Sequence, residues 1–208
     1  MAIVITVAQQ KGGTGKTTLA ANLAAALAPT TRVALLDIDP QKSLTRWHAI
    51  RTERNGQPEL TFSDVSGWRL ATELERLKRG HDVVLIDSPP QIDTDARLAI
   101  RGADLVLVPV QPSPPDVWAA EGTLALAAAE HRNARVVLNR VPPASRLGDT
   151  VKADLATRNL PLLRSAIGNR TGFATAFAAG LGVTEAAPRS AAAVELRALL
   201  AEIEETLR

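Results

Sequence analysis

Residues 9–18 read Gln9-Gln10-Lys11-Gly12-Gly13-Thr14-Gly15-Lys16-Thr17-Thr18. The apolar run 3–8 precedes them and the alanine-rich stretch 19–28 follows, so the sequence predicts a strand, a glycine-rich loop and a helix. Glycines let backbone N–H groups approach and surround a polyphosphate, and the N-terminus of the following helix adds partial positive charge. A nucleoside triphosphate is therefore the first ligand to consider.

The loop departs from the usual phosphate-loop pattern, G-x-x-x-x-G-K-[ST], at its start. Gln10 stands where that pattern has glycine, and Lys11 adds a second lysine ahead of Lys16. An ordinary phosphate loop needs only one lysine. A glycine-rich turn with chance lysines is the simpler alternative, but the strand and helix contexts of the motif are both present. The second lysine suggests a cation that acts on phosphate from a neighbouring subunit.

These residues resemble the signature of the ParA/MinD family of deviant Walker ATPases, K-G-G-x-G-K-[ST]-T. The resemblance continues along the chain: 33–41 (VALLDIDPQ) is similar to the second strand and first switch of the family, and 83–90 (VVLIDSPP) to its Walker B strand and second switch. Further similarity lies in 105–115, 182–185 and 188–192. Nearly the whole chain therefore resembles the compact ParA partition ATPases, which lack an N-terminal helix-turn-helix domain.

Apolar runs rich in Val, Ile and Leu recur along the chain and predict strands that are buried on both faces. The runs are 3–8, 33–37, 82–87, 104–109 and 135–139, with a weaker one at 60–63. Helical stretches alternate with them at 17–28, 43–54, 67–79, 93–101, 116–131, 149–158 and 188–207. The alternation predicts an α/β fold, a doubly wound, mainly parallel sheet flanked by helices. We expect residues 1–208 to form a single ParA-like P-loop ATPase domain.

The resemblance implies a role for each residue of the loop. Lys16 would contact the β and γ phosphates, Thr17 would bind Mg²⁺, and Thr18 would donate to the α phosphate. Lys11 would cross a dimer interface to the ATP of the partner subunit, as an arginine finger does in trans. The residues expected to hold the nucleotide phosphates are Gly12, Gly13, Thr14, Gly15, Lys16, Thr17 and Thr18.

Three aspartates follow predicted strands. Asp37 and Asp39 are two residues apart, so in an extended segment both carboxylates would point the same way. The resemblance places Asp37 near Mg²⁺, makes Asp39 the residue that orients the attacking water, and makes Asp87 the Walker B aspartate that holds Mg²⁺ through a water molecule. Simpler alternatives are an Asp-Pro turn at 39–40 and a strand-end cap at Asp87.

Two residues further along the chain are expected at the base of the nucleotide. Asn139 ends the apolar run 135–139 and matches the family position that reads the adenine edge. Pro143 would flank the base. The resemblance thus implies ATP and Mg²⁺ as cofactors.

Positive charge is concentrated in one segment. The chain has a net charge of +2, yet residues 131–190 hold nine Lys or Arg against three acidic residues. Such asymmetry hints at a surface that meets a polyanion, although on charge alone a solvated, arginine-rich face is the better explanation. ParA proteins bind DNA without sequence preference as ATP-bound dimers, and the resemblance therefore favours DNA. The predicted DNA contacts are Arg146, Arg164, Arg170 and Arg189.

Composition excludes several other classes. The chain has no cysteine, so disulfides, thiolate metal sites and iron–sulfur clusters are excluded. No charged leader precedes the first strand, and no apolar run approaches the roughly 18 residues of a membrane span, so we expect a cytoplasmic, nucleoid-associated protein. The final predicted helix holds four glutamates against two arginines, unlike the basic membrane anchor of MinD.

Together these features predict a ParA-type ATPase that forms a sandwich homodimer on Mg-ATP and binds DNA non-specifically. A ParB-like or other cargo adaptor would stimulate hydrolysis, and the cargo would be a plasmid, a chromosome region or a protein assembly. Two alternatives remain. A MinD-like, membrane-associated ATPase is disfavoured by the acidic C-terminal helix, and a metabolic ATP-dependent ligase or synthetase would need inserted residues to build a substrate pocket.

Overall fold

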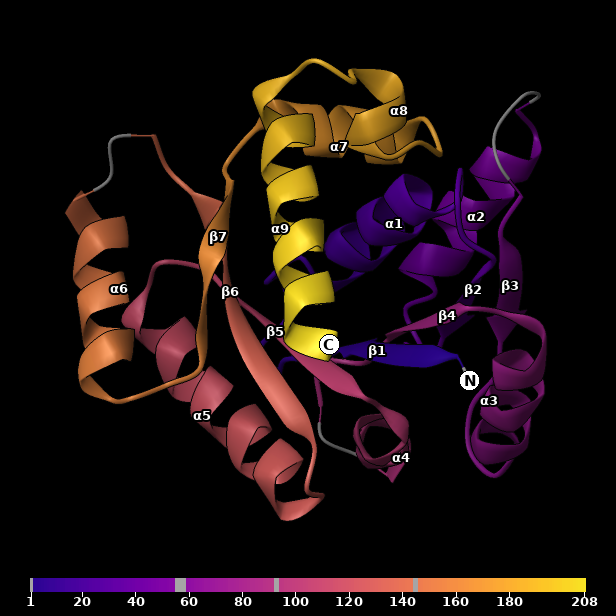
Figure 1. Ribbon diagram of the computed structural model, residues 1–208, viewed down its shortest axis with the longest axis horizontal. Helices are drawn as coiled ribbons and strands as arrows, with labels where there is room; N and C mark the ends of the chain where they lie inside the picture. Colours follow the sequence, from indigo (N-terminus) through magenta and orange to yellow (C-terminus); the bar gives the residue numbers. More distant parts are fainter. Residues whose placement is uncertain (1, 55–58, 92–93, 144–145) are drawn as a thin grey trace.

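A computed structural model describes residues 2–54, 59–91, 94–143 and 146–208, apart from the side chains of residues 146, 147 and 149 (Figure 1). Seven strands form one sheet in the order β3-β2-β4-β1-β5-β6-β7, and every pairing is parallel. Their bounds are β1 Ile3–Val7, β2 Val33–Asp37, β3 Thr61–Asp64, β4 Val83–Asp87, β5 Leu105–Val110, β6 Asn133–Val141 and β7 Leu162–Gly168.

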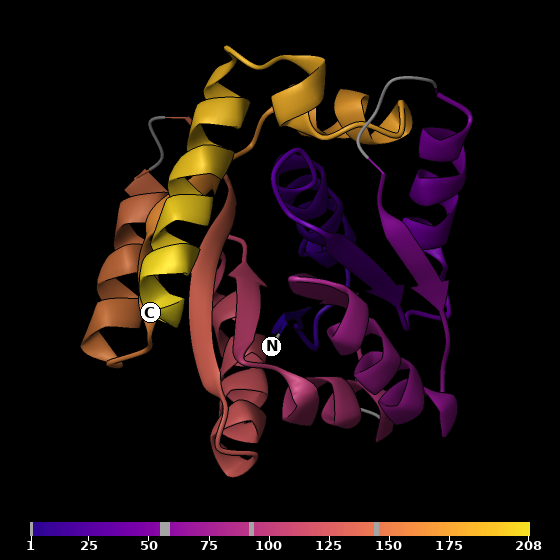
Figure 2. The ribbon, with the colours of Figure 1, turned by 45° about the vertical axis from the view of Figure 1, so that its right-hand side comes forward.

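Helices cover both faces of this sheet, which confirms the predicted doubly wound α/β class. One face carries α1 Lys16–Leu27, α2 Ser43–Thr52, α7 Thr171–Ala178, α8 Val183–Ala186 and α9 Ala191–Leu207. The other carries α3 Arg69–Gly80, α4 Thr94–Gly102, α5 Pro114–Ala129 and α6 Arg146–Thr157. Figure 2 shows the indigo α1 and yellow α9 separated by the sheet from α4 and α5. Among the helices so described, none combines the length and apolarity needed to cross a membrane.

The central strands bury alternate residues in two different cores. On β2, Leu35 packs in the core under α1 and α9, whereas Leu36 packs in the core under α3 and α4. Both leucines are fully buried. Because both faces are covered, these strands appear in the sequence as continuous apolar runs and not as alternating patterns.

The sequence patterns missed β7, α7 and α8. β7 lies at the edge of the sheet, and its register against β6 is irregular. Midway along it, the backbone N–H groups of Arg164 and Ser165 donate to the Glu202 carboxylate of α9, at 2.7 and 2.8 Å. A half-polar edge strand supported by a distant helix gives no apolar run to detect. β6 is also longer than the run 135–139 indicated.

Strand register places the predicted polar residues at one edge of the sheet. Asp37 of β2 pairs with Asp87 of β4, and Asp87 pairs with Val7 of β1. The glycine-rich loop follows β1 directly, so it lies beside both aspartates. This is the carboxyl edge of a parallel sheet, where ligands bind in open α/β folds.

Candidate functional site

The loop between β1 and α1 requires glycine at two positions. Gly13 and Gly15 have φ of 78° and 93°, a left-handed conformation that side chains disfavour. At Gly15 an added Cβ would also lie 2.5 Å from Asn139 Nδ2. Gly15 caps α1, whose first turn contains no acidic residue. The N–H groups and positive dipole end of α1 are therefore available to an anion.

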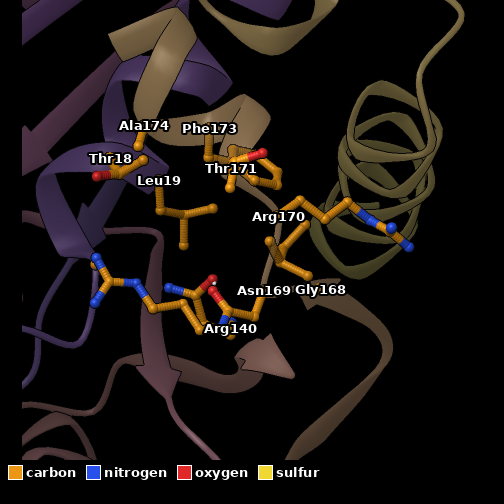
Figure 3. A pocket seen from close by; sticks show the side chains of 12 residues that line it. Thr18, Leu19, Arg140, Gly168, Asn169, Arg170, Thr171, Phe173 and Ala174 are labelled. Atoms are coloured by element: carbon orange, nitrogen blue, oxygen red, sulfur yellow. Dashed lines mark hydrogen bonds between the residues drawn. The ribbon is translucent and has the colours of Figure 1, made fainter. Parts of the chain in front are cut away.

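Two cavities adjoin this loop. The first, of about 350 Å³, lies over the loop and contains most of the predicted phosphate-binding residues. The second, of about 320 Å³, lies between α1 and the β7–α7 connection (Figure 3). Gly15, Thr18 and Arg140 line both, so the cavities form one elongated site. The first suits a polyphosphate and is called the phosphate cavity below. The second suits a nucleoside and is called the nucleoside cavity.

Lys16 lines the phosphate cavity, and its contact with the β and γ phosphates stays a prediction. Its side chain is buried, with Nζ 3.4 Å from the carbonyl oxygen of Lys11. Burial lowers the pKa of Lys16, while the nearby carboxylates of Asp87 and Asp39 act in the opposite direction. A bound polyphosphate would supply the counter-charge that this buried ammonium lacks.

Asp87 is fully buried at the end of β4. Burial raises the pKa of Asp87 to about 8; the Thr17 hydroxyl lowers it and the charge of Asp37 raises it further. Although the Thr17 hydroxyl is near enough to affect this pKa, neither Asp87 oxygen has a partner with hydrogen-bond geometry among the described residues. Such unpartnered buried oxygens fit a hard cation, and Asp87 and Thr17 would hold Mg²⁺. The ion would neutralise phosphate charge.

The structure gives Asp37 and Asp39 different surroundings. Asp37 is fully buried and accepts from Asp39 N at 3.0 Å, Thr45 N at 2.9 Å and Thr45 Oγ1 at 2.7 Å. Both oxygens of Asp37 are thus engaged at the start of α2, so the geometry makes it a turn and helix anchor. Asp39 lines the phosphate cavity and accepts from Gln41 N at 2.8 Å. Its predicted role in orienting water stays a prediction, as does a metal contact by Asp37.

Lys11 does not point into the phosphate cavity. Its ammonium forms an ion pair with the carboxylate of Asp116 in the first turn of α5. Asp116 is buried and also accepts from Ser113 Oγ at 2.5 Å. Sequence reasoning missed Asp116, which lies 105 residues from Lys11. The contact of Lys11 with a partner subunit stays a prediction.

The nucleoside cavity contains one of the two residues predicted at the base. Asn139 lines it, but its side-chain amide contacts the loop. Pro143 is exposed and is not among the residues that line either cavity. The wall facing α1 comes from Asn169, Thr171 and Phe173, as Figure 3 shows. Sequence reasoning missed these residues because β7 and α7 gave no recognisable pattern.

Among the predicted DNA contacts whose side chains the structure describes, Arg164 and Arg189 line neither cavity, whereas Arg170 borders the nucleoside cavity. Arg164 pairs with Glu205 at 2.7 Å and Arg170 with Glu195 at 2.6 Å, both on α9. Figure 3 shows the Arg170 side chain turned away from the cavity. Arg189 is exposed and has no ion pair within the described ranges, and the Arg146 side chain lies outside them. DNA contact by these four arginines stays a prediction.

Comparison with known sequences matches residues 5–183 to the CobQ/CobB/MinD/ParA nucleotide binding domain. The chain is similar to the maintenance of carboxysome distribution protein A of Halothiobacillus neapolitanus. The two are 31% identical over a 211-residue alignment that covers 97% of this chain and 96% of that protein.

Two solved structures show the same fold. A putative plasmid partition protein from Borrelia burgdorferi, bound to AMPPNP, has a TM-score of 0.81 at 19% identity and covers 99% of this chain and 100% of its own. The septum site-determining protein MinD of Pyrococcus horikoshii, complexed with Mg-ADP, has a TM-score of 0.75 at 18% identity, with coverages of 100% and 99%. Both of these proteins thus hold a nucleotide, and the second holds it with Mg²⁺.

Proposed function

Because the chain belongs to the CobQ/CobB/MinD/ParA family of nucleotide-binding domains, we propose that it is a ParA-type ATPase. It binds Mg-ATP, dimerises around two nucleotides, and binds DNA non-specifically as the dimer. An adaptor protein attached to a cargo stimulates hydrolysis and returns the protein to the monomer. The cycle positions the cargo in the cell.

The observation that carries this proposal is the division between two lysines of one loop. Lys16 is buried at the phosphate cavity and suffices to contact phosphates in cis. Lys11 stands outside that cavity, with its side chain 41% exposed. A second, outward lysine is superfluous for binding in one subunit and fits a trans-acting cation. In other phosphate-loop enzymes such a cation contributes about 10³ to 10⁵ in rate.

The similar proteins support two kinds of cargo. The carboxysome-distribution relative matches the chain over nearly its whole length, which favours a protein microcompartment as the cargo. A plasmid is the second candidate, supported by the fold of the plasmid partition protein. To separate the two candidates, the protein is expressed in one host that carries the microcompartment and in another that carries the plasmid, and each cargo is imaged by fluorescence. In the host with the true cargo, loss of the adaptor gene should make that cargo cluster or segregate at random.

Light scattering and phosphate release on four proteins test the proposed cycle. Wild type should dimerise with ATP and not with ADP. Lys11→Ala should bind ATP yet stay monomeric, Asp39→Ala should form a long-lived dimer that does not hydrolyse, and Lys16→Ala should lose nucleotide binding. Equal dimerisation of wild type and Lys11→Ala would remove the trans role.

The membrane-associated alternative makes a different prediction. A MinD-like ATPase would sediment with anionic vesicles in the presence of ATP and ignore DNA. The glutamates of α9 oppose this, since an anionic surface repels them. Vesicle sedimentation and DNA mobility shifts, run on the same ATP-bound sample, distinguish the two functions.

A further inference from the structure

The end of β6 holds the outer side of the phosphate loop. Asn139 Nδ2 donates to the carbonyl oxygen of Thr14 at 2.7 Å, and Arg140 Nη1 donates to that of Gly13 at 3.0 Å. Gln111, in the β5–α5 connection, donates to the same Gly13 oxygen at 2.8 Å. Two successive carbonyl groups of the loop thus receive three side-chain hydrogen bonds.

Peptide planarity turns these bonds into an orientation of the N–H groups. In a trans peptide, the carbonyl of one residue points opposite to the N–H of the next. When the carbonyls of Gly13 and Thr14 are held toward β6 and Gln111, the N–H groups of Thr14 and Gly15 face the other way. Gly13 and Gly15 line the phosphate cavity, as does the Arg140 side chain, so these N–H groups would be available to a phosphate bound there. Convergent backbone N–H groups of this kind form an anion site.

The backbone at Arg140 is itself held by Asn139. Arg140 has a φ of 53°, which a residue with a side chain disfavours. Asn139 Oδ1 accepts from Arg140 N at 3.0 Å and so stabilises this turn. Asn139 is only 6% exposed. One oxygen and one amide hydrogen of its short side chain are therefore committed to the protein.

We propose that Asn139 and Arg140 are positioning residues that preorganise the phosphate loop, and that Asn139 does not read the base. The base is contacted instead by the wall that Leu19, Asn169 and Phe173 form (Figure 3). This inference rests on the proposed function only in requiring that the ligand be a nucleoside triphosphate.

A chemical double-mutant cycle tests the role of Asn139. Calorimetry measures the affinity of wild type and Asn139→Ala for ATP and for purine riboside triphosphate, which lacks the 6-amino group. A positioning residue should lose the same factor with both ligands, about tenfold for the lost hydrogen bonds. A larger loss for ATP than for the analogue would show that Asn139 reads the base edge. Unchanged ATP affinity would also overturn the proposal.

Variants of Arg140 provide the second part of the test. Arg140→Ala should weaken ATP binding, and Arg140→Lys, which keeps a donor for Gly13, should recover part of it. Arg135→Ala is the matched control, because Arg135 lies on the same strand and contacts Asn133 and Ala134. Full ATP affinity in Arg140→Ala would contradict the proposal.

Melting temperatures without nucleotide show whether each variant folds. If Asn139→Ala does not, Asn139→Asp replaces it, because aspartate still accepts from Arg140 N but cannot donate to Thr14. The outcome is independent of the proposed function: a protein that binds ATP but neither dimerises nor binds DNA would refute that function and leave this comparison intact.

Discussion

Burial strongly changes the ionisation of Asp87, and this predicts a pH-dependent stability. Burial raises the pKa of Asp87 to about 8, against about 4 in an unfolded chain. Between these values the native state holds a proton that the unfolded state has released. The free energy of unfolding should therefore fall as the pH rises from 5 to 8.5 in the absence of nucleotide and Mg²⁺.

Asp87→Asn should remove this dependence. It should be more stable than wild type at pH 8.5, by an amount on the order of a few kcal/mol, and the difference should shrink toward pH 5. Denaturant titrations in EDTA measure it. Asp37→Asn is the control: Asp37 is equally buried but hydrogen-bonded, so this change should destabilise the protein. Parallel pH profiles of wild type and Asp87→Asn would contradict the expectation.

For single residues, the sequence predicted which side chains lie together at the edge of the sheet, but it did not predict their hydrogen-bond partners. Lys16, Asp39 and Asp87 all lie at the predicted edge of the sheet, because Lys16 opens the first helix, Asp39 follows β2 and Asp87 ends β4. The partner of Asn139 could not be predicted, since Thr14 lies 125 residues away. Nor could the sequence predict that Thr45, eight residues further along the chain, donates two hydrogen bonds to Asp37.

At the level of helices and strands, the first turn of α5 holds the side chain of Lys11 through the carboxylate of Asp116. If Lys11 acts in trans, it must leave the carboxylate of Asp116 before it reaches a second subunit. Asp116→Asn removes the charge and should let ATP induce dimerisation at a severalfold lower nucleotide concentration. Light scattering during ATP titration measures this. Glu121→Gln, a charge change on the exposed part of α5, is the control, and an identical midpoint for wild type and Asp116→Asn would contradict the prediction.

The packing of α2 against α8 depends on a buried ion pair. Arg51 is 3% exposed and contacts Glu185 at 2.7 Å, and its guanidinium lies 5.4 Å from the Trp47 ring centroid. Glu185→Ala leaves that charge buried, so it should lower the free energy of unfolding by about 3–5 kcal/mol. Glu205→Ala, at an exposed pair, should cost about 1 kcal/mol or less. Denaturant melts of both variants make the comparison, which equal losses would contradict.

Element prediction succeeded where a strand is covered on both faces and failed at the edge. β2, β4 and β5 are buried throughout, as is β1 beyond the exposed Ile3, and all four gave apolar runs. β7 contains Arg164 and Ser165, and its conformation depends on Glu202 from α9. A sequence pattern over neighbouring residues cannot reveal a strand that is stabilised by a residue almost forty positions away. The walls of the nucleoside cavity were missed for the same reason, because they follow β7.

Across the whole molecule, positive and negative segments meet at the junction of β7 and α9. If the ATP-bound dimer binds DNA through Arg170, the phosphates must displace Glu195, which now holds that guanidinium. Arg170→Ala should weaken binding to unrelated duplexes equally and reduce the slope of log K against log salt by about 0.9 per lost contact. Glu195→Gln should strengthen binding. Mobility shifts at several salt concentrations measure both DNA affinities. Unchanged or opposite affinities in the two variants would show that this surface does not bind DNA.

The order of the sheet also determines when the nucleotide site can first exist during synthesis. The loop follows β1, yet Ile3 pairs with Val83 and Ile5 with Leu105, and the donors that hold the loop come from β6, which ends at Val141. A nascent chain carries the whole signature while its first strand still has no neighbour. The phosphate loop cannot be held in place until residue 141 has left the ribosome, and the wall of the nucleoside cavity must wait for residue 173. Because such distant pairings dominate the sheet, we expect refolding to be slow. Nucleotide binding can therefore be used as a signal that β1 has paired with β4 and β5.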